Sequence, residues 1–402
     1  MVQVDTQAFL DDLYALRQIG AFKTGVSRPT YSAADMESRH WLVDRMAEVG
    51  LAGSIDGIGN VFGKTSRPGP IALVGSHIES QIEAGWLDGA LGVVAGLALA
   101  RSGLAVDVCA FADEESHFEG GYIGSRSIVG DLSEAQMDAS RSRDRQQTLR
   151  DALASAGLAG RERVQIDPAR YRGFFEMHIE QGSQLEKDAL KIGVVSGIVG
   201  IWAWSIVVEG QQDHAGGTTM AERRDAGLSA VRLLAALDEV FPKVCGPRST
   251  WTTCNVTFEP GAPVGIIPGR AEIRLEFRDQ SMAVLERMEA ALAAVVQESN
   301  RRERTKATLQ SVNKSMPVIC DSEMIAALAK AAQHHAGTEW QHMPSGAGHD
   351  AKMIAKKLPV SMLFVPSIGG VSHHWTEDTS DEDLALGIQV LASAVETYLA
   401  GR

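Results

Sequence analysis

Two nearly continuous apolar runs, each followed at once by a histidine or by acidic residues, constrain the fold of this chain most strongly. Residues 71–76 (IALVGS) precede His77, and residues 105–112 (AVDVCAFA) precede Asp113. Such runs are typical of strands that are buried on both faces of a parallel sheet. A helical pattern at 90–103 lies between them. This order predicts an α/β fold with a largely parallel sheet that carries polar residues at its strand ends.

The rest of the chain extends this pattern and then interrupts it. Further strands are expected at 173–179, 192–209 and 359–365, with helices at 33–49, 322–335 and 382–399. Between them, helices at 220–240 and 281–300 accompany alternating strands at 249–259 and 271–278. We therefore predict a discontinuous main domain of residues 1–205 and 316–402, with an α+β domain inserted at 206–315.

Composition excludes several classes of function. The formal net charge is −13 over 402 residues, which argues against nucleic acid as a partner because phosphate binding needs a basic face. The four cysteines form no CxxC pair, so neither a thiolate zinc site nor a disulfide framework is expected. No uninterrupted apolar stretch is long enough to span a bilayer, and the N-terminus is acidic where a signal peptide is basic. We expect a cytoplasmic protein without a membrane partner.

The residues that follow the first strand suit a metal site. His77 ends the strand, and Asp88 lies in a glycine-flanked loop that opens the next helix. Imidazole suits zinc, manganese or nickel, and a carboxylate can bridge two ions through its two oxygens. Glu79 could orient the His77 ring from behind. The alternative is a capped loop with a satisfied histidine.

Three more segments bring similar groups to strand ends. Glu114 and Glu115 can divide labour, because one carboxylate can ligate a metal ion while the other takes a proton from water. His178 ends a strand, and His373 follows the strand at 359–365. Each segment alone also fits a structural histidine or a solvated acidic turn. Together they supply three imidazoles and two carboxylates, enough for two ions that share Asp88.

The sequence resembles the amidohydrolase branch of the aminoacylase-type metallopeptidase superfamily. That branch includes N-carbamoyl-L-amino-acid hydrolases, β-ureidopropionases, and allantoate and ureidoglycolate amidohydrolases. The resemblance covers nearly the whole chain and is carried by GSHIES, GWLDGALGV, FADEES, EMHIEQGSQLE, DHAGGTTMAERRDA, RLEFRD, SGAGHDA and FVPSIGGVSHHWTED. It implies a dinuclear-metal catalytic domain with an inserted domain that acts as lid and dimerisation surface.

Carried over to this chain, the resemblance implies a role for each site residue. His77 and His178 would bind one divalent ion, Glu115 and His373 the other, with Asp88 between them. The ions would be manganese or zinc, with cobalt or nickel also acceptable to these ligands. Glu114 would be the general base.

The resemblance also implies the groups that bind the substrate. His214 would stabilise the oxyanion, within one chain or across a homodimer, and Gln181 would contact the scissile amide. Arg278 would pair with the substrate carboxylate, together with the backbone of the glycine-rich stretch that contains Gly348 and His349.

Several residues depart from the family pattern. Glu79 replaces an aspartate and should still orient His77 with a longer arm. Ser116, His117 and Phe118 replace a Gly-x-Arg-Phe pattern. Gly265 replaces an asparagine that helps Arg278, and His374 with Trp375 replaces a small residue and a proline beside His373.

The leading hypothesis is hydrolysis of an N-carbamoyl amino acid or a related small ureido acid. The alternatives are hydrolysis of N-acyl amino acids or aromatic amides, favoured by Gly265 and Trp375, and a non-catalytic binding protein of the same fold. Retention of Glu114 beside all five metal ligands argues against the binding protein.

Overall fold

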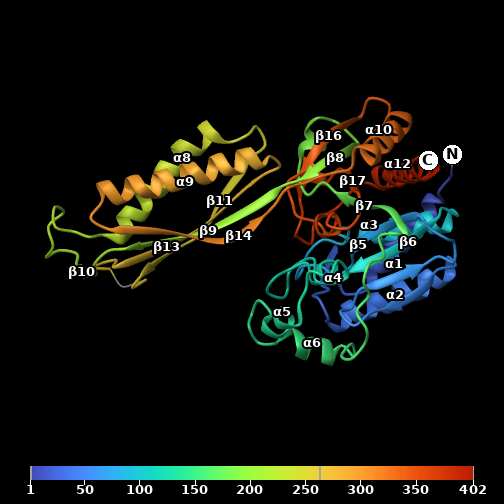
Figure 1. The fold of residues 1–402 in the computed structure, drawn as a ribbon, viewed down its shortest axis with the longest axis horizontal. Helices are drawn as coiled ribbons and strands as arrows, with labels where there is room; N and C mark the ends of the chain where they lie inside the picture. Colours follow the sequence, from blue (N-terminus) through green and yellow to red (C-terminus); the bar gives the residue numbers. More distant parts are fainter. Residues whose placement is uncertain (1, 262–263, 402) are drawn as a thin grey trace. The chain divides into compact units, whose positions relative to one another are not determined.

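The computed structural model describes residues 2–261 and 264–401, which form two compact units (Figure 1). Unit 1 holds the residues up to Ser196 and from Cys320 onward, and unit 2 holds Gly197–Ile319. The expected boundary at 205/206 would cut through strand β9 (Gly200–Glu209). Because every residue of β9 pairs with β13 (Arg270–Asp279) in the sheet of unit 2, the division falls before this strand.

The large sheet, which belongs almost wholly to unit 1, has the order β15-β8-β17-β7-β5-β6-β4-β3, with β16 paired to β8. Strands β17, β7, β5 and β6 run parallel, and β4 and β8 are antiparallel to their neighbours. The strands are β3 (Ala52–Ile55), β4 (Val61–Lys64), β5 (Ile71–His77), β6 (Val106–Phe111), β7 (Tyr171–Ile179), β8 (Ile192–Ile198), β15 (Val318–Ile319), β16 (Trp340–Ser345) and β17 (Val360–Val365). The expected α/β fold with a largely parallel sheet is confirmed.

The helices of unit 1 bury the sheet. Helix α3 packs on β5 and β6, helix α12 packs on β17 and β7, and α10 packs on α12. The helices are α1 (Thr6–Gln18), α2 (Ala33–Glu48), α3 (Ala90–Arg101), α4 (Ile123–Ile128), α5 (Glu134–Ala139), α6 (Leu149–Ser155), α7 (Gln184–Lys187), α10 (Ser322–Ala336), α11 (Asp350–Ile354), α12 (Asp381–Ala400) and the 3-10 turn η1 (Ile368–Gly370). A small hairpin of β1 (Ala21–Phe22) and β2 (Gly25–Val26) follows α1.

Helix α12 is the one described helix whose length and composition would allow it to cross a membrane. In this fold 61% of its most apolar window is buried. Leu384, Ile388, Leu391 and Val395 belong to the main hydrophobic core of unit 1. The apolar character of α12 is therefore accounted for by packing against the sheet.

The parallel strands decide where the polar residues meet. The carboxyl ends of β5, β6, β7 and β17 lie at the same edge of the sheet, since neighbouring strands run in one direction. His77 is the last residue of β5, and Asp113 follows β6 closely. His178 lies at the end of β7. This edge is the usual position of ligand sites in α/β sheets.

Unit 2 is a four-stranded antiparallel sheet in the order β11-β13-β9-β14, with two long helices on one face (Figure 1). Apolar side chains such as Ile206, Ile273 and Phe277 form a core with these helices. Helix α8 starts six residues later than the predicted position 220, because Asp225 caps its N-terminus by accepting from Leu228 N–H. The elements are β10 (Asp213–His214), α8 (Ala226–Val244), β11 (Thr250–Glu259), β12 (Ile266–Ile267), α9 (Met282–Arg302) and β14 (Lys306–Ser315).

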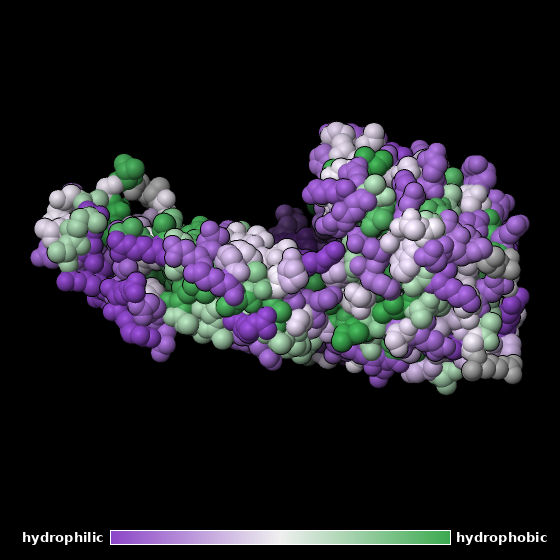
Figure 2. Space-filling view, turned by 90° about the horizontal axis from the view of Figure 1, so that it is seen from above, coloured by the Kyte–Doolittle hydropathy of each residue, from purple (hydrophilic) through white to green (hydrophobic). Residues whose placement is uncertain are grey.

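The outer surface of the two long helices is mixed in character. Apolar side chains from both helices, including Leu233, Val240 and Val295, line a groove between α8 and α9, with Arg232 and Glu298 among the charged residues beside them. Figure 2 shows this helical face as apolar patches among hydrophilic side chains.

Candidate active site

One cluster of ligand-type side chains joins β5, the loop before α3, and β7. Nε2 of His178 lies 3.2 Å from Oδ1 of Asp88, and Nε2 of His77 lies 3.7 Å from the same oxygen. Nitrogen and oxygen atoms of the three residues lie within 4.8 Å of one another, and all three side chains are buried. The structure thus brings together the three residues expected at the first ion.

A second cluster shares Asp88 but uses its other oxygen. Nε2 of His373 lies 3.3 Å from Oδ2 of Asp88 and 3.6 Å from Oε2 of Glu115. Glu115 is buried, whereas the His373 side chain is 52% exposed and the residue has a φ of +55°. Asp88 therefore presents one carboxylate oxygen to each cluster, which is the geometry of a bridging ligand.

Glu114 lies beside the first cluster without belonging to either. Its Oε2 is 3.7 Å from Nε2 of His77, and its side chain is 11% exposed. The side chains of adjacent residues diverge, so Glu114 and Glu115 can have different roles. The arrangement leaves Glu114 as a carboxylate at the edge of the ligand set.

Backbone carbonyl groups orient the two buried imidazoles. Nδ1 of His77 lies 3.0 Å from the carbonyl oxygen of Glu79, and Nδ1 of His178 lies 2.9 Å from that of Ile179. Both rings therefore direct Nε2 toward Asp88. The expectation that the Glu79 side chain orients His77 differs from this structure, since its carboxylate is 3.9 Å from Nδ1. The longer arm reaches past the ring to Glu114 and Arg39 instead.

Burial and neighbouring charged groups together shift the pKa values of the carboxyl groups in the site. Burial raises the pKa of Glu114 well above its usual range, and the charge of Glu115 adds to this rise while His77 opposes it. Burial and the charge of Asp88 raise the pKa of Glu115. Burial also opposes ionisation of Asp88, but the neighbouring imidazoles of His178, His373 and His77 outweigh it and hold the pKa of that carboxyl well below its usual range.

Glu176, His178 and His349 form a third group of ligand-type atoms in the described part of the chain. Glu176 already accepts hydrogen bonds from Ser76 Oγ at 2.6 Å and from Ala351 N–H at 2.9 Å. Nε2 of His349 lies 2.8 Å from Ser345 Oγ. These bonds explain the group as part of the packing between β7 and α11.

The residues expected to bind substrate from unit 1 lie around the clusters. The side-chain amide of Gln181 donates to Oδ2 of Asp88 at 3.0 Å and to Ser372 Oγ at 3.2 Å. The ring of His349 is 4.6 Å from the ring of His178, measured between centroids. Gly348 lies half-buried in the loop that leads into α11.

Sequence reasoning missed the residues that hold Glu115. The side-chain amide of Gln81 donates 2.9 Å hydrogen bonds to both the carbonyl oxygen and Oε2 of Glu115. Arg143 donates to the same carbonyl at 2.8 Å and to Oε1 of Gln81 at 3.3 Å. The only sequence signal for Arg143 was the absence, at 116–118, of the arginine that the Gly-x-Arg-Phe pattern contains.

Sequence reasoning also missed Glu377, which joins the two loops that carry Asp88 and His373. Its Oε1 accepts from the backbone N–H groups of Leu87 and Asp88, and its Oε2 accepts from Ser372 Oγ. Burial and the charge of Asp88 raise the pKa of Glu377 to about 8. A Cβ at Gly85 would lie 1.8 Å from Oε1 of Glu377, so only glycine fits there.

His374 and Trp375 form an aromatic surface next to His373. The two rings lie 4.8 Å apart between centroids, and Nζ of Lys23 lies 4.2 Å from the Trp375 ring. Thr24 Oγ1 donates to the Trp375 carbonyl at 2.7 Å. The β1–β2 hairpin therefore covers one side of this aromatic surface.

The remaining expected residues, His214, Arg278 and Gly265, belong to unit 2. His214 lies in β10, where its Nδ1 accepts hydrogen bonds from the backbone N–H groups of Gly216 and Gly217 at 3.1 and 2.9 Å. Nδ1 is thus an acceptor, so the proton of the neutral ring lies on Nε2. Arg278 lies one residue before the end of β13, with Nε donating to Oε1 of Glu276 at 2.7 Å. Gly265 has a φ of +98°.

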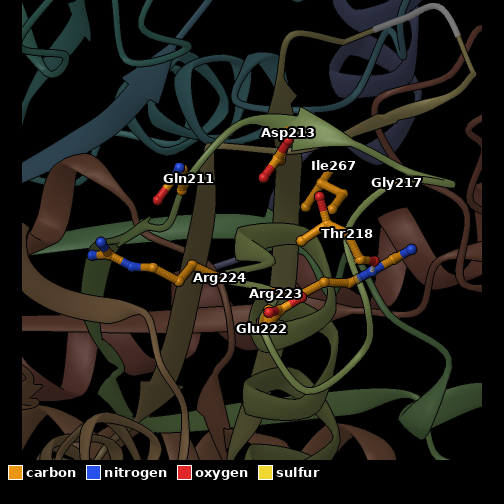
Figure 3. A pocket seen from close by; sticks show the side chains of 8 residues that line it. All are labelled: Gln211, Asp213, Gly217, Thr218, Glu222, Arg223, Arg224 and Ile267. Atoms are coloured by element: carbon orange, nitrogen blue, oxygen red, sulfur yellow. Dashed lines mark hydrogen bonds between the residues drawn. The ribbon is translucent and has the colours of Figure 1, made fainter.

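A pocket of about 290 Å³ lies beside the loop that carries His214 (Figure 3). Arg223 donates to the carbonyl oxygens of Thr218 and Ala215 in this loop, whereas Arg224 donates to the carbonyl of Arg304. Figure 3 shows the two guanidinium groups pointing in opposite directions. The two groups therefore do not form a common anion site, and Arg223 stabilises the loop through its bonds to the loop carbonyls.

Comparison with known proteins decides the family. The family model described as peptidase family M20/M25/M40 matches residues 75–397. The chain belongs to peptidase family M20/M25/M40.

Two relatives that match nearly the whole chain are named as amidohydrolases. The chain is 32% identical to the N-carbamoyl-L-amino acid amidohydrolase of Geobacillus stearothermophilus, over 92% of this chain and 93% of the relative. It is 33% identical to the allantoate amidohydrolase of Bacillus subtilis, over 94% and 93%. The predicted resemblance to this branch is confirmed.

A solved structure also matches the fold. An amidase of the hydantoinase/carbamoylase family from Burkholderia phymatum is 42% identical, with a TM-score of 0.92 and full coverage of both chains. The likeness extends over unit 1 and unit 2, so the inserted α+β domain is part of the family fold.

Proposed function

We propose that this protein is a dinuclear-metal amidohydrolase that cleaves a linear non-peptide C–N bond in an N-carbamoyl amino acid or a related ureido acid. The observation that carries the proposal is the double role of Asp88. Its two oxygens face two different sets of ligand-type residues at the carboxyl edge of a parallel sheet. The names of the relatives support the type of bond and substrate.

The residues present fit two divalent ions. His77 and His178 would hold one ion and Glu115 and His373 the other, with Asp88 bridging. Oε1 of Glu115 is buried without a hydrogen-bond partner in the described residues, so one ligand-type oxygen is still available. When bound, the ions would polarise the scissile carbonyl group and make water more acidic. Histidine and carboxylate ligands suit manganese or zinc, with cobalt or nickel also acceptable.

Glu114 would move the proton. As a base it would accept a proton from the attacking water while the new C–O bond forms. As an acid it would then return this proton to the leaving nitrogen while the C–N bond breaks. Its partly exposed side chain beside His77 suits this task better than the fully packed carboxylates.

Substrate binding would use the four groups that the resemblance assigns to it. Arg278 would pair with the substrate carboxylate, because a planar guanidinium suits a carboxylate in bidentate geometry. The backbone around Gly348 and His349 would donate to the same group. His214 would donate from Nε2 to the oxyanion, and Gln181 would contact the amide of the substrate.

We further propose a cytoplasmic homodimer that associates through unit 2. Strand β11 is an edge strand of ten residues in which no residue is fully buried. Long exposed edges are sites of pairing with another chain. All four cysteines are free thiols, which suits a reducing compartment.

The function is tested with purified protein loaded with manganese or zinc. Ammonia release would be measured on a panel of N-carbamoyl amino acids and other ureido acids, and amine release on matched N-acyl amino acids. We expect ammonia from one or more ureido acids and much slower cleavage of the N-acyl series. Preference for the N-acyl series would support the alternative hydrolase. Binding of the panel without turnover in either metal would support a binding protein.

A further inference from the structure

We propose that Glu79 is a positioning residue for Glu114 and that buried Arg39 holds it in that role. The proposal rests on the base role proposed above for Glu114. Oε1 of Glu79 accepts a hydrogen bond of 2.7 Å from the backbone N–H of Glu114. The His77 ring is held by the Glu79 carbonyl oxygen at 3.0 Å, and the Glu79 carboxylate lies 3.9 Å away. The side chain of Glu79 therefore serves the base, and its backbone serves the metal ligand.

The length of the side chain decides which partner it reaches. An aspartate at position 79 would be shorter by one C–C bond of about 1.5 Å. From the same backbone position it would fall short of the Glu114 N–H. The length of the glutamate side chain thus lets its carboxylate reach the backbone of the proposed base.

Arg39 on helix α2 fixes the Glu79 carboxylate from the other side. Its Nη2 donates to Oε2 of Glu79 at 3.0 Å, its Nε to Asp35 at 3.0 Å, and its Nη1 to the Gly59 carbonyl at 2.6 Å. The side chains of Arg39, Asp35 and Glu79 are fully buried. A guanidinium holds three such partners in fixed directions, which lysine cannot do.

The segment that carries Glu114 needs such a restraint. Asp113 and Ser116, on either side of Glu114 and Glu115, have φ values of +59° and +55°. Residues with side chains adopt this left-handed region only when surrounding contacts hold them there. Asp113 accepts from His117 N–H at 2.8 Å, and Glu79 supplies the matching contact at Glu114.

The test is the substitution Glu79→Asp in the metal-loaded enzyme. We expect two metal ions per chain, an almost unchanged KM, and a kcat lower by about 10- to 100-fold, the effect of a small misplacement of a reacting group. Hydrogen–deuterium exchange should become faster in the peptide that contains Glu114 and stay unchanged elsewhere in unit 1. An unchanged kcat would overturn the proposal. A lower metal content with an unchanged kcat of the metal-loaded enzyme would overturn it as well.

A control variant separates positioning from general destabilisation. Asp107 is also a buried carboxylate that accepts from one backbone N–H, that of Thr65, and from one arginine, Arg170, and in addition from the Tyr171 hydroxyl. It lies at the opposite end of β6 from the site. Asp107→Asn should lower Tm while the kcat of the metal-loaded enzyme stays unchanged. Equal kcat losses in this variant and in Glu79→Asp would show a merely structural role.

Two further variants keep the outcome decisive. Arg39→Lys keeps the positive charge but loses the planar guanidinium group. It should therefore show the same kcat loss and faster exchange as expected for Glu79→Asp. This variant tests the proposal even if Glu79→Asp does not fold. In a Glu114→Gln background, Glu79→Asp should cause no further loss. If Glu114→Gln were itself active, the proposed base role would fail. If it were inactive while Glu79→Asp and Arg39→Lys kept full kcat, only the positioning role would fail.

Discussion

Oε1 of Glu377 accepts a hydrogen bond of 3.1 Å from the backbone N–H of Asp88, although 289 residues separate them in the sequence. The same carboxylate accepts from Ser372, next to His373. One buried side chain thus ties the loop of the proposed bridging ligand to the loop of the most exposed ligand.

Glu377→Ala should weaken binding at the second ion. Without this acceptor, the His373 loop loses its contact with the Asp88 loop. We expect about 10- to 100-fold lower affinity for the second ion, as for other residues that orient metal ligands. Metal titration followed by elemental analysis would measure this. Glu382→Ala, an exposed change nearby on α12, is the control and should bind two ions normally.

Glu114→Gln should retain metal and lose turnover. The amide keeps the shape of the side chain but cannot accept and return a proton. We expect a loss of several orders of magnitude in kcat with normal metal content. Single-turnover assays with metal analysis of the same sample would check it, and ordinary kcat would remove Glu114 from the role.

Arg278→Ala should raise KM for carboxylate substrates by tenfold or more, because a charged hydrogen bond to the substrate is lost. Arg274 lies four residues earlier on the same face of β13 and pairs with Glu272 at 2.7 Å. Arg274→Ala is therefore the matched control and should leave KM unchanged. An unchanged KM in Arg278→Ala would place the anchor elsewhere.

Arg223→Ala should lower kcat through His214. The loss of two bonds to the Ala215 and Thr218 carbonyls would loosen the loop that fixes Nε2 of His214 as the donor. We expect about a tenfold lower kcat, with no further loss when His214→Ala is also present. Arg224→Ala, whose side chain points the other way, should keep kcat within twofold of the parent enzyme.

Removal of metal should lower Tm. Asp88, Glu114 and Glu115 bring three carboxyl groups into one buried region, and ions that bind only the folded chain stabilise it. Addition of manganese or zinc after chelation should restore Tm. The variant Asp88→Ala lacks the shared ligand, so its Tm should respond little; an equal response would argue for metal binding elsewhere.

The sequence alone determined the class of fold. Apolar runs without alternation at 71–76 and 105–112 became β5 and β6, because a strand covered on both faces has no solvent side. The alternating pattern at 271–278 became β13, with apolar residues toward α8 and α9 and a charged row on the other face. The motifs named His77, Asp88, Glu114, Glu115, His178 and His373 as neighbours in the proposed site.

Only the tertiary structure decided how these residues are held. The single expected run at 192–209 is two strands, β8 and β9, which belong to different sheets. The roles of Arg39, Gln81, Arg143 and Glu377 depend on where distant loops meet at the carboxyl edge of the sheet. Local spacing carries no information about such contacts, because strand pairing brings together residues that lie up to hundreds of positions apart.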